Sequence, residues 1–253
     1  MKKALVTGAS SGIGTVFVRE LAGQGYDVTC VARSEEKLQG LSKELGGSHR
    51  YIKADLTGAN DLAAICQELS DSKYNLLVNN AGYGIYDRFE NIPLEKVHHL
   101  IRLNVSAIVD LSHSFLKSAS SGDALINVSS ALSLLPYPGG AVYSATKAFV
   151  TNFTEALWYE YKDQGIYVMA LLPGVTDTNF HHVAMAQRDY QAPGGPSYPP
   201  EVVVKEALAA LQKRKSSTLI SGPKYRFLTT LATRLMSRAQ MISMMGKGSA
   251  GLK

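Results

Sequence analysis

The sequence predicts a single-domain α/β fold: a doubly wound parallel sheet of about seven strands, flanked by helices. Short apolar runs rich in β-branched residues alternate with longer segments of helical periodicity, as in repeated β-α-β units. The chain of 253 residues, 45% hydrophobic and 19% charged, is long enough for one large core. Ligands of such sheets bind beyond the carboxyl ends of the strands.

Each strand and helix is predicted from the local pattern of apolar and polar residues. The predicted strands are residues 3–7, 27–32, 50–53, 76–79, 124–128, 167–172 and, more weakly, 217–220. The predicted helices are residues 13–22, 35–45, 61–69, 94–117, 142–161, 201–212 and, as one amphipathic helix, 225–245. Ser34 suits a helix start, because its hydroxyl can cap orphan amides. Residues 179–200, rich in Gly, Pro and polar side chains, predict a long loop that could cover a substrate.

The formal net charge of +5 is concentrated near the C-terminus. No acidic residue follows Glu206, whereas nine basic residues do: Lys213, Arg214, Lys215, Lys224, Arg226, Arg234, Arg238, Lys247 and Lys253. Such a tail can attract anionic lipid, an acidic substrate or a partner's acidic face, although a solvated helix face is the simpler interpretation. Nucleic-acid binding is disfavoured, because the tail carries no recognition motif.

The expected location is cytoplasmic. Cys30 and Cys66 fall in a predicted strand and a predicted helix, so we expect buried thiols rather than a disulfide. Gly8 interrupts the first apolar run too early for a secretory signal. No run approaches the ~18 consecutive apolar residues that a membrane-spanning helix requires.

The first predicted strand ends in the glycine-rich turn Thr7-Gly8-Ala9-Ser10-Ser11-Gly12-Ile13-Gly14. Glycines let the backbone approach a pyrophosphate, and the helix that follows presents its positive end. An ordinary tight turn is the alternative, but the strand before and the helix after favour a dinucleotide. Arg33, after the second predicted strand, suits the 2′-phosphate of NADP better than the hydroxyls of NAD, so we expect NADPH unless Arg33 simply opens a helix.

Tyr143 and Lys147 lie four residues apart, on one face of a predicted helix. Lowering a tyrosine pKa from near 10 to about 7 needs roughly 4 kcal/mol of preferential phenolate stabilisation. A close lysine and a cationic cofactor ring could supply much of it in a dry pocket. Ser130 ends the fifth predicted strand, and its neighbour Ser129 points to the opposite face, so only one of the two can reach a common site.

Taken together, these motifs resemble the short-chain dehydrogenase/reductase family, whose fold is Rossmann-like. The resemblance covers roughly the first 180 residues and is closest to a broad bacterial branch of NADP-preferring reductases. It rests on the glycine turn, Asp55, Asn79-Asn80-Ala81-Gly82, Asn104, Ser130, Tyr143, Lys147 and Pro173-Gly174, which occur in this order.

The resemblance implies hydride transfer between NADPH and a carbonyl or alcohol substrate, with general acid-base catalysis by Tyr143. Ser130, selected over Ser129 by the family spacing, would bind the substrate oxygen. Lys147 would bind the nicotinamide ribose and lower the pKa of Tyr143, and Asn104 would hold a water of the proton relay. The implied cofactor contacts are Gly8, Ser10, Ser11, Gly12, Ile13, Gly14, Arg33, Asp55, Leu56, Asn80, Ala81, Gly82, Tyr143, Lys147, Pro173, Gly174, Thr176 and Thr178.

The remaining expectations concern organisation and partners. Residues 1–223, including the loop near 179–200, would form the dinucleotide-binding and catalytic domain, and residues 224–253 a basic amphipathic extension. We expect a ketone, aldehyde, 3-oxoacyl or steroid-like substrate, a homodimer or homotetramer, no metal, and peripheral membrane contact at most through the tail. An NADPH-binding sensor or a membrane-associated scaffold without turnover is the alternative function, although every catalytic residue is retained.

Some residues have two interpretations. Asn79 could tie neighbouring strands rather than bind a cofactor. The side chains that follow the strand-end motifs could line an apolar pocket or belong to a lid or a dimer surface; they are Tyr83, Tyr86, Phe89, Leu132, Leu135 and Tyr137. We expect His181 and His182 to face solvent, and His98 and His99 to be exposed or interfacial.

Overall fold

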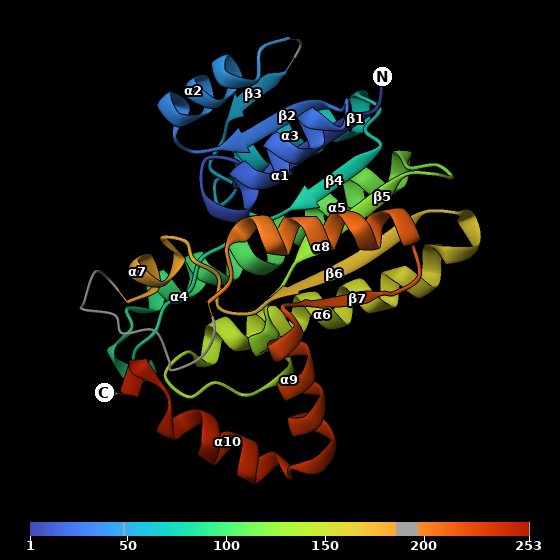
Figure 1. Ribbon diagram of the computed structural model, residues 1–253. Helices are drawn as coiled ribbons and strands as arrows, with labels where there is room; N and C mark the ends of the chain where they lie inside the picture. The colour runs from blue at the N-terminus through green and yellow to red at the C-terminus, as the bar shows by residue number, and fades with distance from the viewer. Residues whose placement is uncertain (48, 186–196, 253) are drawn as a thin grey trace.

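Seven parallel strands form one sheet in the order β3-β2-β1-β4-β5-β6-β7, which confirms the predicted fold class (Figure 1). The computed structural model describes residues 1–47, 49–185 and 197–252, except the side chains of 182, 183 and 250. The strands are β1 (Lys3–Thr7), β2 (Asp27–Ala32), β3 (Arg50–Lys53), β4 (Leu76–Asn79), β5 (Ala124–Val128), β6 (Tyr167–Pro173) and β7 (Thr218–Ser221).

Helices cover both faces of the sheet (Figure 1). One face is covered by α1 (Gly12–Gly23), α2 (Glu35–Leu45) and α8 (Pro200–Lys213), and the other by α3 (Ala59–Asp71), α5 (Ala107–Ser118) and α6 (Ala141–Tyr161). Strand side chains alternate between the layers. On β1, Ala4 and Val6 join the first layer and Leu5 the second, so this central strand is apolar on both faces.

The helix predicted over 94–117 contains a π-helical turn. It consists of α4 (Leu94–Ile101), a π-helical segment over Arg102–Ser106 and α5. Asn104 lies in the π-helical segment and is fully buried. Such turns are frequent at functional sites. Hydrophobic periodicity finds the extent of this helix but not the turn within it.

The prediction of one helix over 225–245 is wrong. The chain forms α9 (Pro223–Leu235) and α10 (Arg238–Lys247), followed by a short 3-10 turn over Ala250–Leu252. Met236 adopts an extended backbone between them, and Ser237 caps α10 through reciprocal bonds with Gln240. No helix in the part of the chain that the structure describes is long and apolar enough to cross a membrane.

The segment predicted as a loop over 179–200 is only partly described. It begins with the short helix α7 (Phe180–Ala184), which the sequence pattern did not predict. Residues 186–196 lie outside the described residues. At its far end Tyr198 pairs with Thr176, which lies just after β6, so this end is tied to the sheet.

Candidate active site

A cavity of about 1030 Å³ lies beyond the carboxyl ends of the strands. It reaches from the start of α2 to the residues that follow α10. All of the site residues predicted from the sequence line it, except Gly14 and Asn104. The motifs, which are scattered over more than 170 positions from Gly8 to Thr178, therefore belong to one site.

The glycine turn at the start of α1 fits a phosphate group. Gly8 and Gly12 have φ angles of 67° and 54°, which L side chains rarely adopt. Gly14 serves packing instead, because a Cβ there would overlap the carbonyl oxygen of Gly8. No acidic side chain occupies the first turn of α1, so its positive end faces the cavity uncompensated.

The turn that follows β4 is fastened to the glycine turn. The Thr7 hydroxyl accepts hydrogen bonds from the backbone amides of Asn80 and Ala81, at 2.9 and 3.0 Å. The Asn80 side chain donates to the carbonyl oxygens of Thr7 and Gly8. Asn79 points elsewhere and donates to Asn127 on β5 at 2.9 Å, which confirms that it ties neighbouring strands.

The segment after β6 closes the cavity near the glycine turn. A Cβ on Gly174 would overlap the Tyr225 ring, so this position admits only glycine. Thr178 lies against Gly12, where a Cβ would come within 3.0 Å of its methyl group. Thr176 donates to the carbonyl oxygen of Gly174 at 3.0 Å, which stabilises this bend.

The far end of the cavity is basic. Arg33, Ser34 and Lys37 line it together with Leu56. Ser34 occupies the N-cap position of α2, as predicted, but its hydroxyl makes no capping bond, and the residue borders the cavity instead. Lys37, which the sequence reading missed, lies four residues after Arg33, and that helical spacing is the signal that could have found it. Two cations and a hydroxyl fit the 2′-phosphate of NADP.

A chain of hydrogen bonds links Asp55, at this basic end, to Tyr83. Thr57 donates to Asp55 at 2.7 Å and contacts His99 at 3.1 Å, and His99 contacts the Tyr83 hydroxyl at 2.9 Å. Although burial raises the pKa of Asp55, hydrogen bonds from Thr57 and the positive charge of Arg33 outweigh it and lower that pKa. His99 is half-buried within this chain, whereas His98 is exposed.

The two serines at the end of β5 have different partners. Ser129 donates to the carbonyl oxygen of Lys147 at 2.8 Å and contacts the Thr151 hydroxyl at 2.7 Å. Both serines border the cavity, contrary to the expectation that only one would reach it, but the Ser129 hydroxyl is engaged by these two partners. The Ser130 hydroxyl lies near Tyr143 and acts to lower the pKa of that phenol, so Ser130 remains the serine that we predict to act with it.

Tyr143 and Lys147 lie side by side on α6, and both are buried. The Lys147 ammonium lies 5.9 Å from the centre of the Tyr143 ring and donates to the carbonyl oxygen of Val128 at 2.8 Å. Burial raises the pKa of Tyr143 to about 12, against the opposing effect of the Ser130 hydrogen bond. Burial lowers the pKa of Lys147 to about 8. The protein's own groups thus do not produce the expected decrease in the pKa of Tyr143.

Asn104 holds the site together from behind. Its carbonyl oxygen accepts from the Tyr83 amide at 3.3 Å, and its amide group donates to the Tyr83 carbonyl and to the Thr146 hydroxyl on α6. It does not border the cavity. Its geometry is that of a positioning residue that joins the loop after β4 to α6.

Comparison with known proteins identifies the family. The model described as short chain dehydrogenase matches residues 2–189. The chain belongs to the short-chain dehydrogenase family. The 17-beta-hydroxysteroid dehydrogenase type 3 of Homo sapiens is 34% identical over 184 residues, which cover 69% of this chain and 59% of that protein. The inactive hydroxysteroid dehydrogenase-like protein 1 of Homo sapiens is 32% identical over 179 residues, 67% of this chain and 54% of that one.

A solved structure extends the similarity. The short-chain dehydrogenase from Sphingobium yanoikuyae in complex with NADPH matches with a TM-score of 0.80 and 30% identity, over 93% of this chain and 95% of that one. In contrast, the chain spans little more than half the length of the two human relatives. These findings confirm the family resemblance and the fold read from the sequence.

Beside Tyr143 of this short-chain dehydrogenase, the cavity is apolar and aromatic. The Tyr143 ring lies 5.8 Å from the Tyr86 ring and 5.5 Å from the Phe180 ring, centre to centre. The side chains at this end are Tyr86, Leu132, Tyr137, Phe180, His181, Met244 and Met245. His181 borders the cavity, contrary to expectation, whereas the His182 side chain lies outside the described residues. Leu135 and Phe89 do not line the cavity, and Phe89 is 59% exposed.

The C-terminal segment of the dehydrogenase forms part of this wall. Met244, Met245 and Gly248 line the cavity. Ser249 is fully buried and donates its hydroxyl to the carbonyl oxygen of Pro138. Gly251 is pressed against Gly139, since a Cβ on Gly251 would overlap the Gly139 carbonyl oxygen. The sequence reading missed these contacts, because they join segments that are far apart in the chain.

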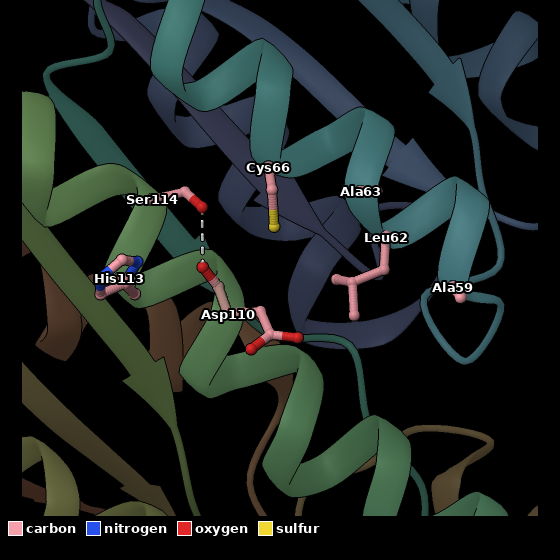
Figure 2. A pocket seen from close by; sticks show the side chains of 7 residues that line it. All are labelled: Ala59, Leu62, Ala63, Cys66, Asp110, His113 and Ser114. Carbon is pink, nitrogen blue, oxygen red and sulfur yellow. Dashed lines mark hydrogen bonds between the residues drawn. The ribbon is translucent and has the colours of Figure 1, made fainter.

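A second hollow, of about 380 Å³, lies between α3 and α5 (Figure 2). It is lined by Ala59, Leu62, Ala63, Cys66, Asp110, His113 and Ser114. Burial raises the pKa of the Cys66 thiol, so this group is a poor nucleophile, and Ser114 donates to the Asp110 carbonyl oxygen. Both cysteines are free thiols, as expected, but only Cys30 is buried, whereas Cys66 is half-buried. Among the described residues, no group of three or more His, Cys, Asp and Glu side chains is arranged to hold a metal ion.

Proposed function

We propose that this chain is an NADPH-dependent oxidoreductase that reduces a bulky, apolar carbonyl compound or oxidises the corresponding alcohol. One observation supports the proposal above all: a single cavity is lined by the basic pair Arg33 and Lys37 and by Ser130 and Tyr143. An extended NADPH has its adenosine 2′-phosphate at one end, its pyrophosphate in the middle and its nicotinamide ring at the other end. Arg33 and Lys37, the glycine turn, and the pair Ser130 and Tyr143 line the cavity and would serve these three parts in turn.

The proposed chemistry is general acid catalysis. A bound nicotinamide would supply or accept the hydride. Ser130 and Tyr143 would both hydrogen-bond the substrate oxygen, and Tyr143 would give its proton to that oxygen as charge develops there. A pKa of about 12 keeps the phenol protonated at neutral pH, which suits the reductive direction. The Lys147 ammonium would stabilise the phenolate that remains.

The substrate class follows from the wall beside Tyr143. Aromatic and methionine side chains offer apolar contacts, and the cavity there holds no carboxylate or ammonium besides Lys147 among the described lining residues. The similarity to a hydroxysteroid dehydrogenase supports a ketone or secondary alcohol carried on an apolar ring system. A 3-oxoacyl compound also fits these contacts.

The alternative is an NADPH-binding sensor or scaffold without turnover. One human relative bears the name of an inactive protein. Ser130, Tyr143, Lys147 and Asn104 are all retained in this chain, which favours the enzyme. A cytoplasmic location and a homo-oligomer remain part of the proposal.

The test is Tyr143→Phe in the full chain, with Tyr159→Phe on the same helix as the control, because Tyr159 is 65% exposed. Removing the proton donor should lower turnover of a reducible ketone by about 100-fold or more, while calorimetric NADPH affinity stays within about 2-fold. Turnover is followed by the loss of NADPH absorbance. Near-normal turnover of Tyr143→Phe would contradict the assignment, and a wild-type protein that binds NADPH but reduces no carbonyl in a broad panel would favour the sensor.

A further inference from the structure

The exposed apolar side chains of this protein are concentrated on its C-terminal extension. Thirteen large hydrophobic residues are exposed in the described part of the chain, and seven of them follow residue 226. These seven are Phe227, Leu228, Leu231, Leu235, Ile242, Met244 and Leu252. Single exposed apolar residues are ordinary, but a group of this size indicates contact with an apolar partner.

Four of these residues share one side of α9. Successive residues of an α-helix are rotated by about 100°, so Phe227, Leu228, Leu231 and Leu235 fall within an arc of about 100°. Their exposed fractions are 66%, 54%, 42% and 73%, respectively. Thr229, which is buried, lies on the opposite side and faces the body of the protein. The outer face of α9 is therefore apolar and uncovered.

The same extension is positively charged. Lys224, Arg234, Arg238 and Lys247 are exposed, and none of them forms a salt bridge with a described residue. Arg226 is excluded from this group because it pairs with Glu206 at 3.6 Å. Since no acidic residue follows Glu206 in the sequence, this positive charge is not compensated within the extension.

We propose that the α9–α10 extension docks on the surface of an anionic lipid bilayer. A helix face of large apolar side chains flanked by lysine and arginine is the pattern of helices that lie in a membrane interface. A second copy of the chain fits less well, because a two-fold contact would set the patch against itself and bring like charges together. An acidic protein could pair with the cations, but it would also need an apolar groove to hold the four exposed side chains of α9.

The extension that carries this face is also a wall of the cavity. Tyr225, near the start of α9, and Met244 and Met245, near the end of α10, line it. Docking would thus hold the apolar end of the cavity close to the lipid in which an apolar substrate dissolves. This last step rests on the proposed function, whereas the docking itself does not.

The test is co-sedimentation of the full-length protein with vesicles, in the absence of substrate. Vesicles of equal parts phosphatidylglycerol and phosphatidylcholine should retain the protein, high salt should release much of it, and phosphatidylcholine alone should retain little. Leu228→Ser combined with Leu231→Ser should lower the bound fraction by about 10-fold. The control is Phe89→Ser combined with Phe149→Ser, which removes exposed apolar groups elsewhere and should change binding little.

Circular dichroism verifies that both double variants are folded, and light scattering gives the mass of each. Equal loss of binding in both variants, or retention that is independent of anionic lipid, would overturn the proposal. So would a wild-type oligomer that becomes a monomer only in the Leu228→Ser, Leu231→Ser variant, because a second copy would then occupy the face. Binding needs no turnover, so an inactive enzyme would leave a positive vesicle result intact.

Discussion

Tyr143 and Lys147 depend on burial for their chemistry. A dry environment disfavours the charged form of each, and so raises the pKa of the phenol to about 12 and lowers the pKa of the ammonium to about 8. At neutral pH, the Tyr143 phenol therefore keeps its proton and Lys147 is still mostly charged. In the proposed reaction, the Lys147 ammonium would help to balance the negative charge that remains on Tyr143 after it gives up its proton.

This balance predicts the pH dependence of reduction. We expect kcat/KM for a ketone to be level near neutral pH and to fall as the pH rises through about 8, where Lys147 loses its proton. Lys147→Arg should move the fall to higher pH, because a guanidinium stays charged. The check is a pH profile of both proteins with NADPH saturating. A fall at the same pH in Lys147→Arg would assign it to another group.

Among single residues, the sequence predicts those whose functional partners lie in the same segment of the chain. Tyr143 and Lys147 share a helical turn, and the glycine turn is continuous in the sequence. The sequence did not predict the role of His99. Its contact with Thr57 joins positions 42 apart and forms only when α4 packs beside the segment that follows β3. Ser34 shows the reverse case: the residue type fits a cap, but the hydroxyl makes no capping bond and borders the cavity.

At the scale of elements, the start of α2 concentrates the features that would select a phosphorylated cofactor. Arg33 precedes this helix, Lys37 follows one turn later, and both border the cavity. Lys43, in the last turn of the same helix, does not. The two lysines therefore form a matched pair.

We predict that Lys37→Glu raises the KM for NADPH by about 10-fold and changes the KM for NADH little, because only NADPH carries the 2′-phosphate that this lysine would contact. Lys43→Glu introduces the same charge change at the end of α2 and should leave both constants near their wild-type values. Steady-state kinetics with each cofactor provides the measurement. Parallel increases for NADPH and NADH in Lys37→Glu would show that the residue does not contact this phosphate.

The strands were predicted to within one residue, because buried parallel strands are continuous apolar runs bounded by turns. The break between α9 and α10 was not predicted, because the apolar spacing continues across Met236 and Ser237. The sequence nevertheless contains a signal for this break. Ser237 and Gln240 have the spacing of a capping box, which marks a new helix start.

At the scale of the whole molecule, the chain returns at its C-terminal end to loops that it formed earlier. Ser249 bonds to Pro138, and Gly251 packs on Gly139 in the loop between β5 and α6 (Figure 1). The wall beside Tyr143 is therefore assembled from segments more than 100 positions apart. Such a wall can change without disturbing the glycine turn at the other end of the cavity.

Gly251→Ala tests this separation. The added Cβ would overlap the Gly139 carbonyl oxygen, so the last turn must shift. We expect the KM for a bulky apolar ketone to change by about 3-fold or more, with calorimetric NADPH affinity unchanged. Gly246→Ala is the control, because its Cβ would meet Pro138 at an ordinary 3.5 Å. Loss of NADPH binding in Gly251→Ala would show that the two ends of the cavity are coupled.

The π-helical turn between α4 and α5 has a consequence for how this chain tolerates changes in length. A π-helical turn accommodates one residue more than an α-helical turn does, so deleting one residue from Arg102–Ser106 could restore a regular helix without a break. Because the wide turn absorbs the extra residue, α4 and α5 would stay in phase after the deletion, and Leu111 and Phe115 would keep their places in the core. Asn104 would lose its position in the wide turn, and with it the bonds to Tyr83 and Thr146. A one-residue deletion should therefore spare the core and break the link between the loop after β4 and α6.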